Sequence, residues 1–188
     1  SSRKRCMTDL ELHCLENSVR EGALLPPDTT IFINLHPSVL GDRRIVDGLN
    51  AATARHGLSP ERVVLEITEQ AAMRQIPATL ASIDSLRERG FRFALDDVGI
   101  AYSHLLHVGR VRPAFMKISQ EFGVDFHRHE FKAKIVRNVM SLARDFDCEV
   151  ILEGVEDHRA AEAARALGIR YVQGFLFGRP QRAKVWID

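Results

Sequence analysis

Two spacings of apolar residues alternate along the chain, one typical of β-strands and the other of amphipathic helices. Runs rich in β-branched residues, such as residues 29–34, predict strands, while apolar residues recurring on one helical face, such as Leu10, Cys14 and Val19, predict helices. Strands are predicted over residues 29–34, 62–67, 91–96, 114–118, 148–153 and 170–173. Helices are predicted over residues 8–22, 43–56, 71–90, 131–146 and 158–167, with Pro77 as a candidate kink and a short helical turn at residues 103–107.

Strands that alternate with amphipathic helices indicate βα units and a mainly parallel sheet. The predicted strand ends lie about 28 residues apart, close to the spacing in a (β/α)₈ barrel of about 250 residues. A chain of 188 residues is then about two units short of eight. Two α/β folds remain open: a doubly wound open sheet, or a modified (β/α)₈ barrel of TIM type with about six of its eight βα units present. We expect a single domain.

Composition and charge narrow the class of protein. The chain has 26 Lys and Arg against 25 Asp and Glu, a net charge of +1, and 45% hydrophobic residues, which is typical of a globular protein. This balance argues against a broad basic face for DNA or RNA. No apolar run is long enough to span a membrane. Three cysteines without metal-type spacing predict reduced thiols and a cytoplasmic location. Because the chain starts with Ser1 rather than Met, we expect a fragment or a processed product.

Polar residues stand at the carboxyl end of every predicted strand. They are Asn34, Glu66, Asp96 with Asp97, Lys117, Glu153 and Gln173. In an α/β barrel these ends meet on one face, where the active site is built. Carboxylate and amide oxygens favour Mg²⁺, Mn²⁺ or Ca²⁺, and divalent cations relieve the repulsion between gathered carboxylates. Two such ions can activate a water and stabilise the leaving oxygen of a phosphodiester.

Other polar and aromatic residues leave several interpretations open. Lys117 can orient or deprotonate a water, form a structural ion pair with Asp96 or Asp97, or form a Schiff base as in aldolase-type barrels. The segment of residues 127–129 (H-R-H) is most simply a solvated loop before a helix. His104 and His107 share a helical face and are weaker metal candidates. Phe175, Phe177 and Trp186 are either core residues or a stacking surface for a base.

Six short motifs in fixed order resemble those of the EAL-domain family. They are Asn34-Leu35 (N-L-S, with His36 for serine), residues 66–69 (E-x-T-E), residues 96–99 (D-D-F-G), Lys117-Ile118 (K-I, with Ser119 for aspartate), residues 153–156 (E-G-V-E) and residues 173–180 (Q-G-x-x-F-x-x-P). The family consists of bacterial phosphodiesterases that linearise cyclic di-GMP on a modified (β/α)₈ barrel. The resemblance implies a single EAL-like domain over residues 1–188 that lacks its amino-terminal part.

The resemblance also implies residue roles. Metal ligands would be Asn34, Glu66, Asp96 and Asp97, with two Mg²⁺ or Mn²⁺ ions as cofactors. Lys117 and Glu153 would be catalytic, Lys117 acting on the attacking water. Supporting roles fall on Glu69, Glu156 and Gln173, and ligand contacts on Gln173, Phe177 and Pro180. The implied partners are cyclic di-GMP, a second copy in a homodimer and a fused regulatory or sensory domain.

Two departures from the family keep a second function open. The Glu-Ala-Leu tripeptide, whose Glu is a metal ligand in the family, is absent, and residues 98–104 read V-G-I-A-Y-S-H where the family usually has F-G-T-G-Y-S-S. Ala101 adopts positive φ less readily than glycine. We therefore expect either a metal-dependent phosphodiesterase that produces linear pGpG, or a degenerate EAL-like receptor or scaffold that binds without turnover. If nothing precedes Ser1, we expect an open seam and an inactive chain.

Overall fold

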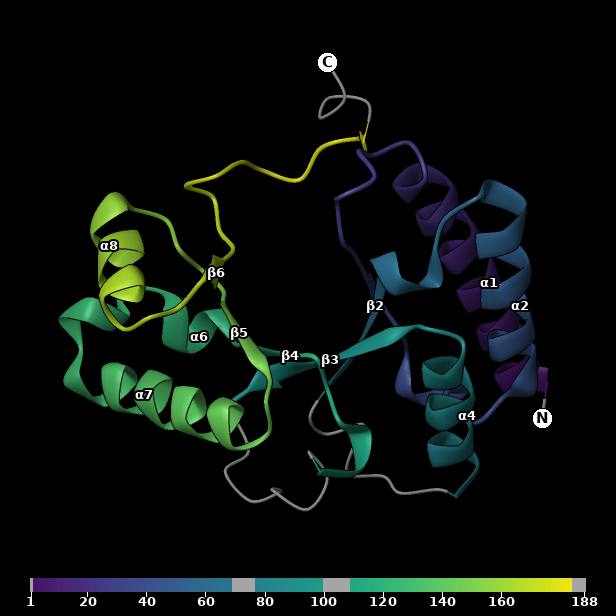
Figure 1. Cartoon of the computed structure of the whole chain (residues 1–188), viewed down its shortest axis with the longest axis horizontal. Helices are drawn as coiled ribbons and strands as arrows, with labels where there is room; N and C mark the ends of the chain where they lie inside the picture. The colour runs from purple at the N-terminus through teal and green to yellow at the C-terminus, as the bar shows by residue number, and fades with distance from the viewer. Residues whose placement is uncertain (1, 69–76, 100–108, 184–188) are drawn as a thin grey trace. The chain divides into compact units, whose positions relative to one another are not determined.

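The computed structural model describes residues 2–68, 77–99 and 109–183 (Figure 1). The α-helices are α1 (Ser2–Gly22), α2 (Arg43–His56), α4 (Pro77–Glu88), α6 (Gln120–Gly123), α7 (Glu130–Asp145) and α8 (His158–Ala166). The strands are β1 (Ile31–Asn34), β2 (Val63–Thr68), β3 (Arg92–Val98), β4 (Phe115–Ile118), β5 (Glu149–Leu152) and β6 (Tyr171–Val172). Short 3₁₀ helices are η1 (Pro37–Val39), η2 (Pro60–Arg62) and η3 (Phe126–Arg128).

The strands follow one another in the sheet in the order of the chain, β1 to β6. The pairs β1/β2, β3/β4, β4/β5 and β5/β6 are parallel. The predicted α/β class with parallel strands is confirmed. Strand order reverses at a switch point in a doubly wound sheet, whereas it follows the chain throughout a (β/α)₈ barrel. The observed order therefore selects the barrel type of the two folds that the sequence left open.

The chain divides into two compact units. Unit 1 consists of residues 1–67, 74–93 and 181–188, and unit 2 consists of residues 68–73 and 94–180. The expectation of one domain over residues 1–188 stays a prediction.

In unit 1, helices α1 and α2 pack against each other. Leu15 and Val19 of α1 and Leu49 of α2 are buried. Residues 63–67 of β2 are buried without interruption, which is typical of a parallel strand covered on both faces. This continuous burial explains why β2 reads as an apolar run rather than as an alternating pattern.

In unit 2, β3, β4, β5 and β6 lie side by side, with α7 and α8 among the elements that accompany them (Figure 1). Helix α7 buries one apolar face through Ile135, Val136 and Val139, and α8 buries the small residues Ala160 and Ala164. Small residues allow a helix to approach its neighbours closely, and α8 packs near η3.

Some element boundaries differ from the predicted ones. Helix α1 begins at Ser2, six residues before its predicted start. The described part of the third predicted helix begins at Pro77, where a proline fits the first helical turn, and residues 69–76 lie outside the described residues. The predicted turn at residues 103–107 also lies outside them. No helix among the described residues is long and apolar enough to cross a membrane.

Asp42 fixes the start of α2 within unit 1. Its carboxylate accepts hydrogen bonds from the backbone N–H of Arg44 at 3.1 Å and from the hydroxyl of Thr8 at 3.0 Å. The Arg44 guanidinium lies 2.9 Å from the same carboxylate. The side-chain hydrogen bond from Arg44 is the main reason that the pKa of Asp42 is lowered from 3.8 to about 2. This residue therefore joins α1 to α2 as a charged cap.

We predict that Asp42→Ala lowers the free energy of unfolding by about 1 to 2 kcal/mol at pH 7, because α2 loses its N-cap. Since the folded-state pKa of Asp42 lies below its ordinary value, the stabilisation is complete above about pH 4 and disappears as the pH falls towards 2. Urea denaturation of both proteins at several pH values measures this difference. Asp47→Ala, an exposed position on the same helix, is the control. A difference that does not shrink in acid would contradict the prediction.

Candidate active site

Strand β3 contains a β-bulge at its carboxyl end, within unit 2. Leu95 pairs with Met116 and Val98 pairs with Ile118, so that Asp96 and Asp97 together lie opposite the single residue Lys117. The backbone of Asp97 has φ +58°, a left-handed conformation that Asp tolerates better than most residues. Bulges often redirect side chains next to active sites. Here the bulge gives the two adjacent carboxylates different environments: Asp96 is half-buried and Asp97 is exposed.

Lys117 forms the centre of the site in unit 2. Its side chain is 6% exposed, and its Nζ lies 3.2 Å from Oδ1 of Asp96 and 2.8 Å from Oε1 of Glu153. A buried ammonium group is tolerated only where carboxylates or other acceptors pair with it. The ion pair to Asp96 was one of the interpretations expected from the sequence. The second ion pair, to Glu153, joins the ends of β3, β4 and β5 in one charged cluster.

Glu153 and Gln173 follow the last residues of β5 and β6. The backbone N–H of Glu153 donates to Ile118 O at 3.2 Å, and that of Gln173 donates to Leu152 O at 2.8 Å. These bonds continue the ladder beyond the strands, so both residues lie at the carboxyl end of the sheet. Glu153 is half-buried, whereas Gln173 is exposed.

Gly123 explains how the backbone of Glu153 is held. A Cβ atom at Gly123 would collide with the carbonyl oxygen of Glu153. Only glycine therefore allows α6 to approach the end of β5 this closely. Because the carboxylate of Glu153 contacts Lys117, this close approach helps to position the ion pair.

Asn34 and Glu66 occupy equivalent positions on neighbouring strands of unit 1. They are partners in the β1/β2 register, and Leu35 N–H donates to Glu66 O at 2.9 Å. Glu66 is 5% exposed, while Asn34 is exposed. Just beyond Asn34, the backbone N–H of His36 donates to the Glu11 carboxylate at 2.7 Å, which ties the strand end to α1. Asn34 is the last residue of β1, as the sequence predicts, whereas Glu66 lies two residues before the end of β2.

The remaining predicted site residues are more dispersed. Glu156, Phe177 and Pro180 are exposed, and Glu69 lies outside the described residues, as do His104, His107 and Trp186. Phe175 and Phe177 are more than half exposed, so the core interpretation of these two rings is wrong. The Arg179 guanidinium lies 4.5 Å from the centroid of the Phe175 ring. The segment after β6 thus presents aromatic rings to solvent beside the strand ends.

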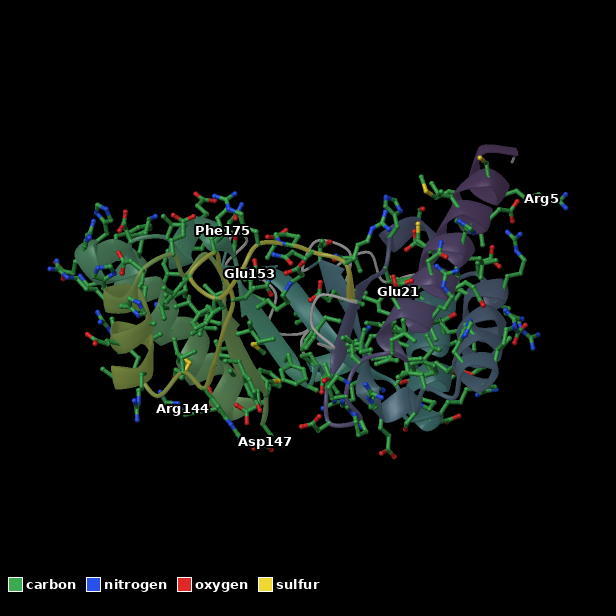
Figure 2. All side chains as sticks on the ribbon, turned by 90° about the horizontal axis from the view of Figure 1, so that it is seen from above. Arg5, Glu21, Arg144, Asp147, Glu153 and Phe175 are labelled. Atoms are coloured by element: carbon green, nitrogen blue, oxygen red, sulfur yellow. The ribbon has the colours of Figure 1, made fainter. Side chains whose placement is uncertain are left out.

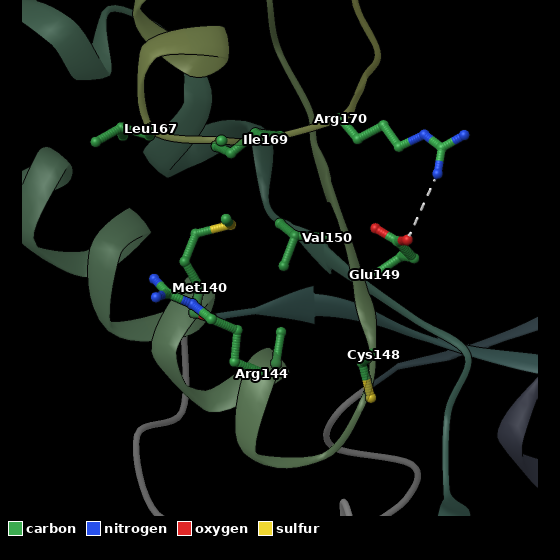
Figure 3. Close-up of a pocket in the computed structure, with 10 residues that line it drawn as sticks. Met140, Arg144, Cys148, Glu149, Val150, Leu167, Ile169 and Arg170 are labelled. Atoms are coloured by element: carbon green, nitrogen blue, oxygen red, sulfur yellow. Dashed lines mark hydrogen bonds and ion pairs between the residues drawn. The ribbon is translucent and has the colours of Figure 1, made fainter.

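A separate pocket of about 330 Å³ lies at the other end of these strands (Figure 3). It is lined by Cys148, Glu149 and Val150 at the start of β5 and by residues 167–170, with Met140 and Arg144 from α7. Figure 2 shows Glu153 and Phe175 on one side of unit 2 and Arg144 and Asp147 on the other. Since barrel enzymes carry their chemistry at the carboxyl ends of strands, this pocket is not the candidate active site.

Cys148 lines this pocket, and its thiol is weakly reactive. Its thiol donates to the Pro113 carbonyl oxygen at 3.0 Å. Burial, with a smaller contribution from the charge of Asp147, raises the pKa of Cys148 to about 11. A thiol with so high a pKa is a poor nucleophile at neutral pH. Cys6, Cys14 and Cys148 are all free cysteines.

With this geometry established, comparison with known proteins identifies the family. The family model described as the EAL domain matches residues 2–180. The chain belongs to the EAL domain family. The resemblance predicted from the six motifs is confirmed. Of the motif residues, Glu66, Asp96 and Lys117 lie within the last three residues of β2, β3 and β4, and Glu153 directly follows β5.

Two curated relatives of this EAL domain are larger proteins. The bifunctional diguanylate cyclase/cyclic di-GMP phosphodiesterase MucR of Pseudomonas aeruginosa is 34% identical over 157 residues, which are 84% of this chain and 23% of MucR. The probable cyclic di-GMP phosphodiesterase PdeA of Escherichia coli is 32% identical over 174 residues, 91% of this chain and 24% of PdeA. The chain thus spans about a quarter of the length of these relatives.

Solved structures of EAL proteins share the fold. A complex of the MucR phosphodiesterase with cyclic di-GMP gives a TM-score of 0.88 at 30% identity, covering 98% of this chain and 76% of that chain. Klebsiella pneumoniae BlrP1 with calcium and cyclic di-GMP gives a TM-score of 0.82 at 31% identity, covering 90% of this chain and 44% of the BlrP1 chain. BlrP1 with manganese and cyclic di-GMP gives a TM-score of 0.79, covering 92% of this chain and 44% of the BlrP1 chain. The predicted partial barrel of this family is confirmed.

Sequence reasoning missed two features of this EAL domain. It paired Lys117 with the aspartates but not with Glu153, because the register that aligns β4 with β5 is not visible in the motifs. It also treated residues 127–129 as a solvated loop. This is wrong for His127, whose ring nitrogens are both buried, although His129 is exposed. Of its two neighbouring aspartates, Asp125 is close to His127 in the sequence, whereas Asp157 is brought near it only by the fold.

We predict that Gly123→Ala destabilises the chain by roughly 1 to 3 kcal/mol, because the new methyl group displaces the backbone of Glu153. Denaturation by urea, followed by circular dichroism, measures the loss. Gly109→Ala is the matched control, since its Cβ would make an ordinary contact of 3.5 Å with Phe146. Equal stability of the two variants would show that the approach of α6 to Glu153 is not restrictive.

Proposed function

We propose that this chain is part of a metal-dependent phosphodiesterase that hydrolyses cyclic di-GMP to linear pGpG. The observation that carries the proposal is the buried ammonium of Lys117 between the carboxylates of Asp96 and Glu153, at the ends of three successive strands. The relatives MucR and PdeA, named as cyclic di-GMP phosphodiesterases, support the substrate. In the proposed reaction one water is added and one phosphodiester P–O bond breaks. The oxygen of one nucleoside leaves as a hydroxyl group, and the phosphate stays on the other nucleoside.

The predicted metal ligands have the chemistry that hard divalent cations require. Asn34, Glu66, Asp96 and Asp97 offer amide and carboxylate oxygens, which suit Mg²⁺ and Mn²⁺. Glu66 is a buried carboxylate beside Asn34 in the β1/β2 register, and the bulge gives Asp97 an exposed carboxylate. The calcium and manganese complexes of BlrP1 support divalent metal binding in the family. Bound ions would activate a water and stabilise the leaving oxygen of the phosphodiester.

Lys117 would serve the reaction through its fixed position. Its two carboxylate partners hold the ammonium at the strand ends and keep it charged, so that it orients the attacking water and offsets negative charge on the phosphate. Glu153, as its closest partner, would share in orienting that water. Permanent charge pairing also makes a Schiff base at Lys117 unfavourable, because the amine must lose its proton to attack a carbonyl.

The exposed segment after β6 would contact the dinucleotide. Gln173, Phe177 and Pro180 all lie in this segment, and Phe177 is 55% exposed. An exposed ring at the mouth of a site can stack on a purine base, which contributes about 1 to 3 kcal/mol. Glu69 and Glu156 remain proposed supports of the neighbouring loops.

The surroundings of the site are also proposals. Because the curated relatives are about four times longer than this chain, we propose that it works beside a regulatory or sensory domain. We further propose a homodimer, which follows from the family resemblance, and a cytoplasmic location, which follows from the three free cysteines.

The deciding experiment measures cyclic di-GMP hydrolysis by the whole protein that contains this chain, as the cell makes it, with Mn²⁺ or Mg²⁺. We predict that Lys117→Met lowers the rate at least about 100-fold while cyclic di-GMP still binds, because the ammonium acts on the water and the phosphate. Chromatography of the nucleotides measures turnover, and calorimetry measures binding. Lys134→Met, an exposed lysine paired with Glu130, is the control and should keep the rate.

Two outcomes would contradict the proposal. Tight binding of cyclic di-GMP by the unsubstituted protein without any turnover would support the receptor or scaffold instead. Full activity of Lys117→Met would remove Lys117 from the reaction, even if hydrolysis were confirmed.

A further inference from the structure

Three side chains of unit 2 gather away from the strand-end site. Asp125, His127 and Asp157 each offer one ligand atom, and these atoms lie within 4.8 Å of one another. Asp125 precedes η3, His127 lies within it, and Asp157 precedes α8. Among the residues that the structure describes, this is the one group of three or more His, Cys, Asp or Glu side chains with such spacing. No role in the proposed hydrolysis requires it.

His127 is the unusual member of this cluster. Both of its ring nitrogens are buried, and neither has a hydrogen-bond partner within the described part of the chain. The ring packs edge-on against the buried Phe126, with the centroids 6.0 Å apart. A buried imidazole normally satisfies at least one nitrogen with a protein group, a water or a metal ion. Its lone pair therefore faces the carboxylates as an unused ligand.

The two aspartates supply negative charge in fixed positions. Oδ1 of Asp157 accepts a 2.7 Å hydrogen bond from the backbone N–H of Ala160 and caps α8. This bond, and to a lesser extent the charges of His127 and Arg128, lowers the pKa of Asp157. Asp125 has φ +54°, which places it at the turn into η3. Both carboxylates are thus available beside the imidazole.

Arg128 is the competing cation at this cluster. Its guanidinium lies 3.3 Å from Asp125 and 3.7 Å from Asp157, and its side chain is 53% exposed. Exposed ion pairs of this kind contribute little to stability, so the arginine can leave for solvent at small cost. A divalent ion would bring twice the charge and would also use the imidazole, which an arginine cannot.

We propose that Asp125, His127 and Asp157 bind one transition-metal dication of the zinc class. One imidazole with two carboxylates is a ligand set for Zn²⁺ with a water completing the coordination, whereas Mg²⁺ and Ca²⁺ prefer oxygen ligands alone. Bonds of about 2.0 to 2.2 Å would draw the three ligand atoms closer together than they lie without the ion. The bound ion would join η3 to the start of α8.

The test is calorimetric titration of the 188-residue chain with ZnCl₂ at pH 7. We expect one Zn²⁺ to bind with a Kd on the order of micromolar or tighter, and His127→Ala to weaken it at least about tenfold. Arg128→Gln should strengthen binding a few-fold, because it removes the competing cation. His129→Ala, which removes an exposed imidazole from the same segment, is the matched control and should bind as before.

The variant Glu66→Gln distinguishes this site from zinc binding at the strand ends. It should leave the binding of Zn²⁺ at His127 unchanged. The ring ¹⁵N resonances of His127 in the unsubstituted chain should shift on adding Zn²⁺ and not on adding Mg²⁺, a measurement that does not depend on how a variant folds. Unchanged His127 resonances at saturating Zn²⁺ would overturn the proposal. An equal response to Mg²⁺ would overturn the assignment to the zinc class.

Discussion

A positive charge buried near the carboxyl end of a parallel strand sets the requirements for the neighbouring strands. Lys117 is the last residue but one of β4, and its ammonium is tolerated there because Asp96 approaches from β3 and Glu153 from β5. Each partner depends on a local device. Asp96 is turned by a bulge, and Glu153 is reached only because Gly123 allows α6 to pack against it. The ion pairs of Lys117 therefore depend on the backbone packing at these strand ends.

The parallel type of the sheet could be predicted from the sequence pattern, which left the order of the strands open between two folds. The β-branched runs and the helical spacing of apolar residues are local properties, and the parallel arrangement follows from their alternation. The ends of the helices could be predicted less well from the sequence. Helix α1 extends to Ser2 although few apolar residues mark its first turns, and Asp42 could be recognised as a cap only once its contacts to Thr8 and Arg44 were known.

The site could be predicted as a set of positions but not as a set of contacts. A polar residue after an apolar run marks a strand end, which is why Asn34 and Lys117 lie at or next to the ends of β1 and β4. Which carboxylate pairs with Lys117 depends on the register between strands, and a sequence does not state that register. The burial of the two ring nitrogens of His127 was hidden for a similar reason. Its partners Asp125 and Asp157 are separated by 32 residues in the chain but meet through the packing of η3 near α8.

The bulge in β3 also changes the phase of the strand. Side chains two residues apart normally share a face, yet Leu95 and Val98, three apart, pair with Met116 and Ile118, which are two apart. The bulge thus keeps Val98 on the face of Leu95, and both side chains are buried. Deleting either aspartate would remove the bulge and leave Val98 opposite Ile118 in regular alternation, still on the face of Leu95. Burial of Val98 therefore does not require the additional residue, and what that residue adds to the strand is a second carboxylate opposite Lys117.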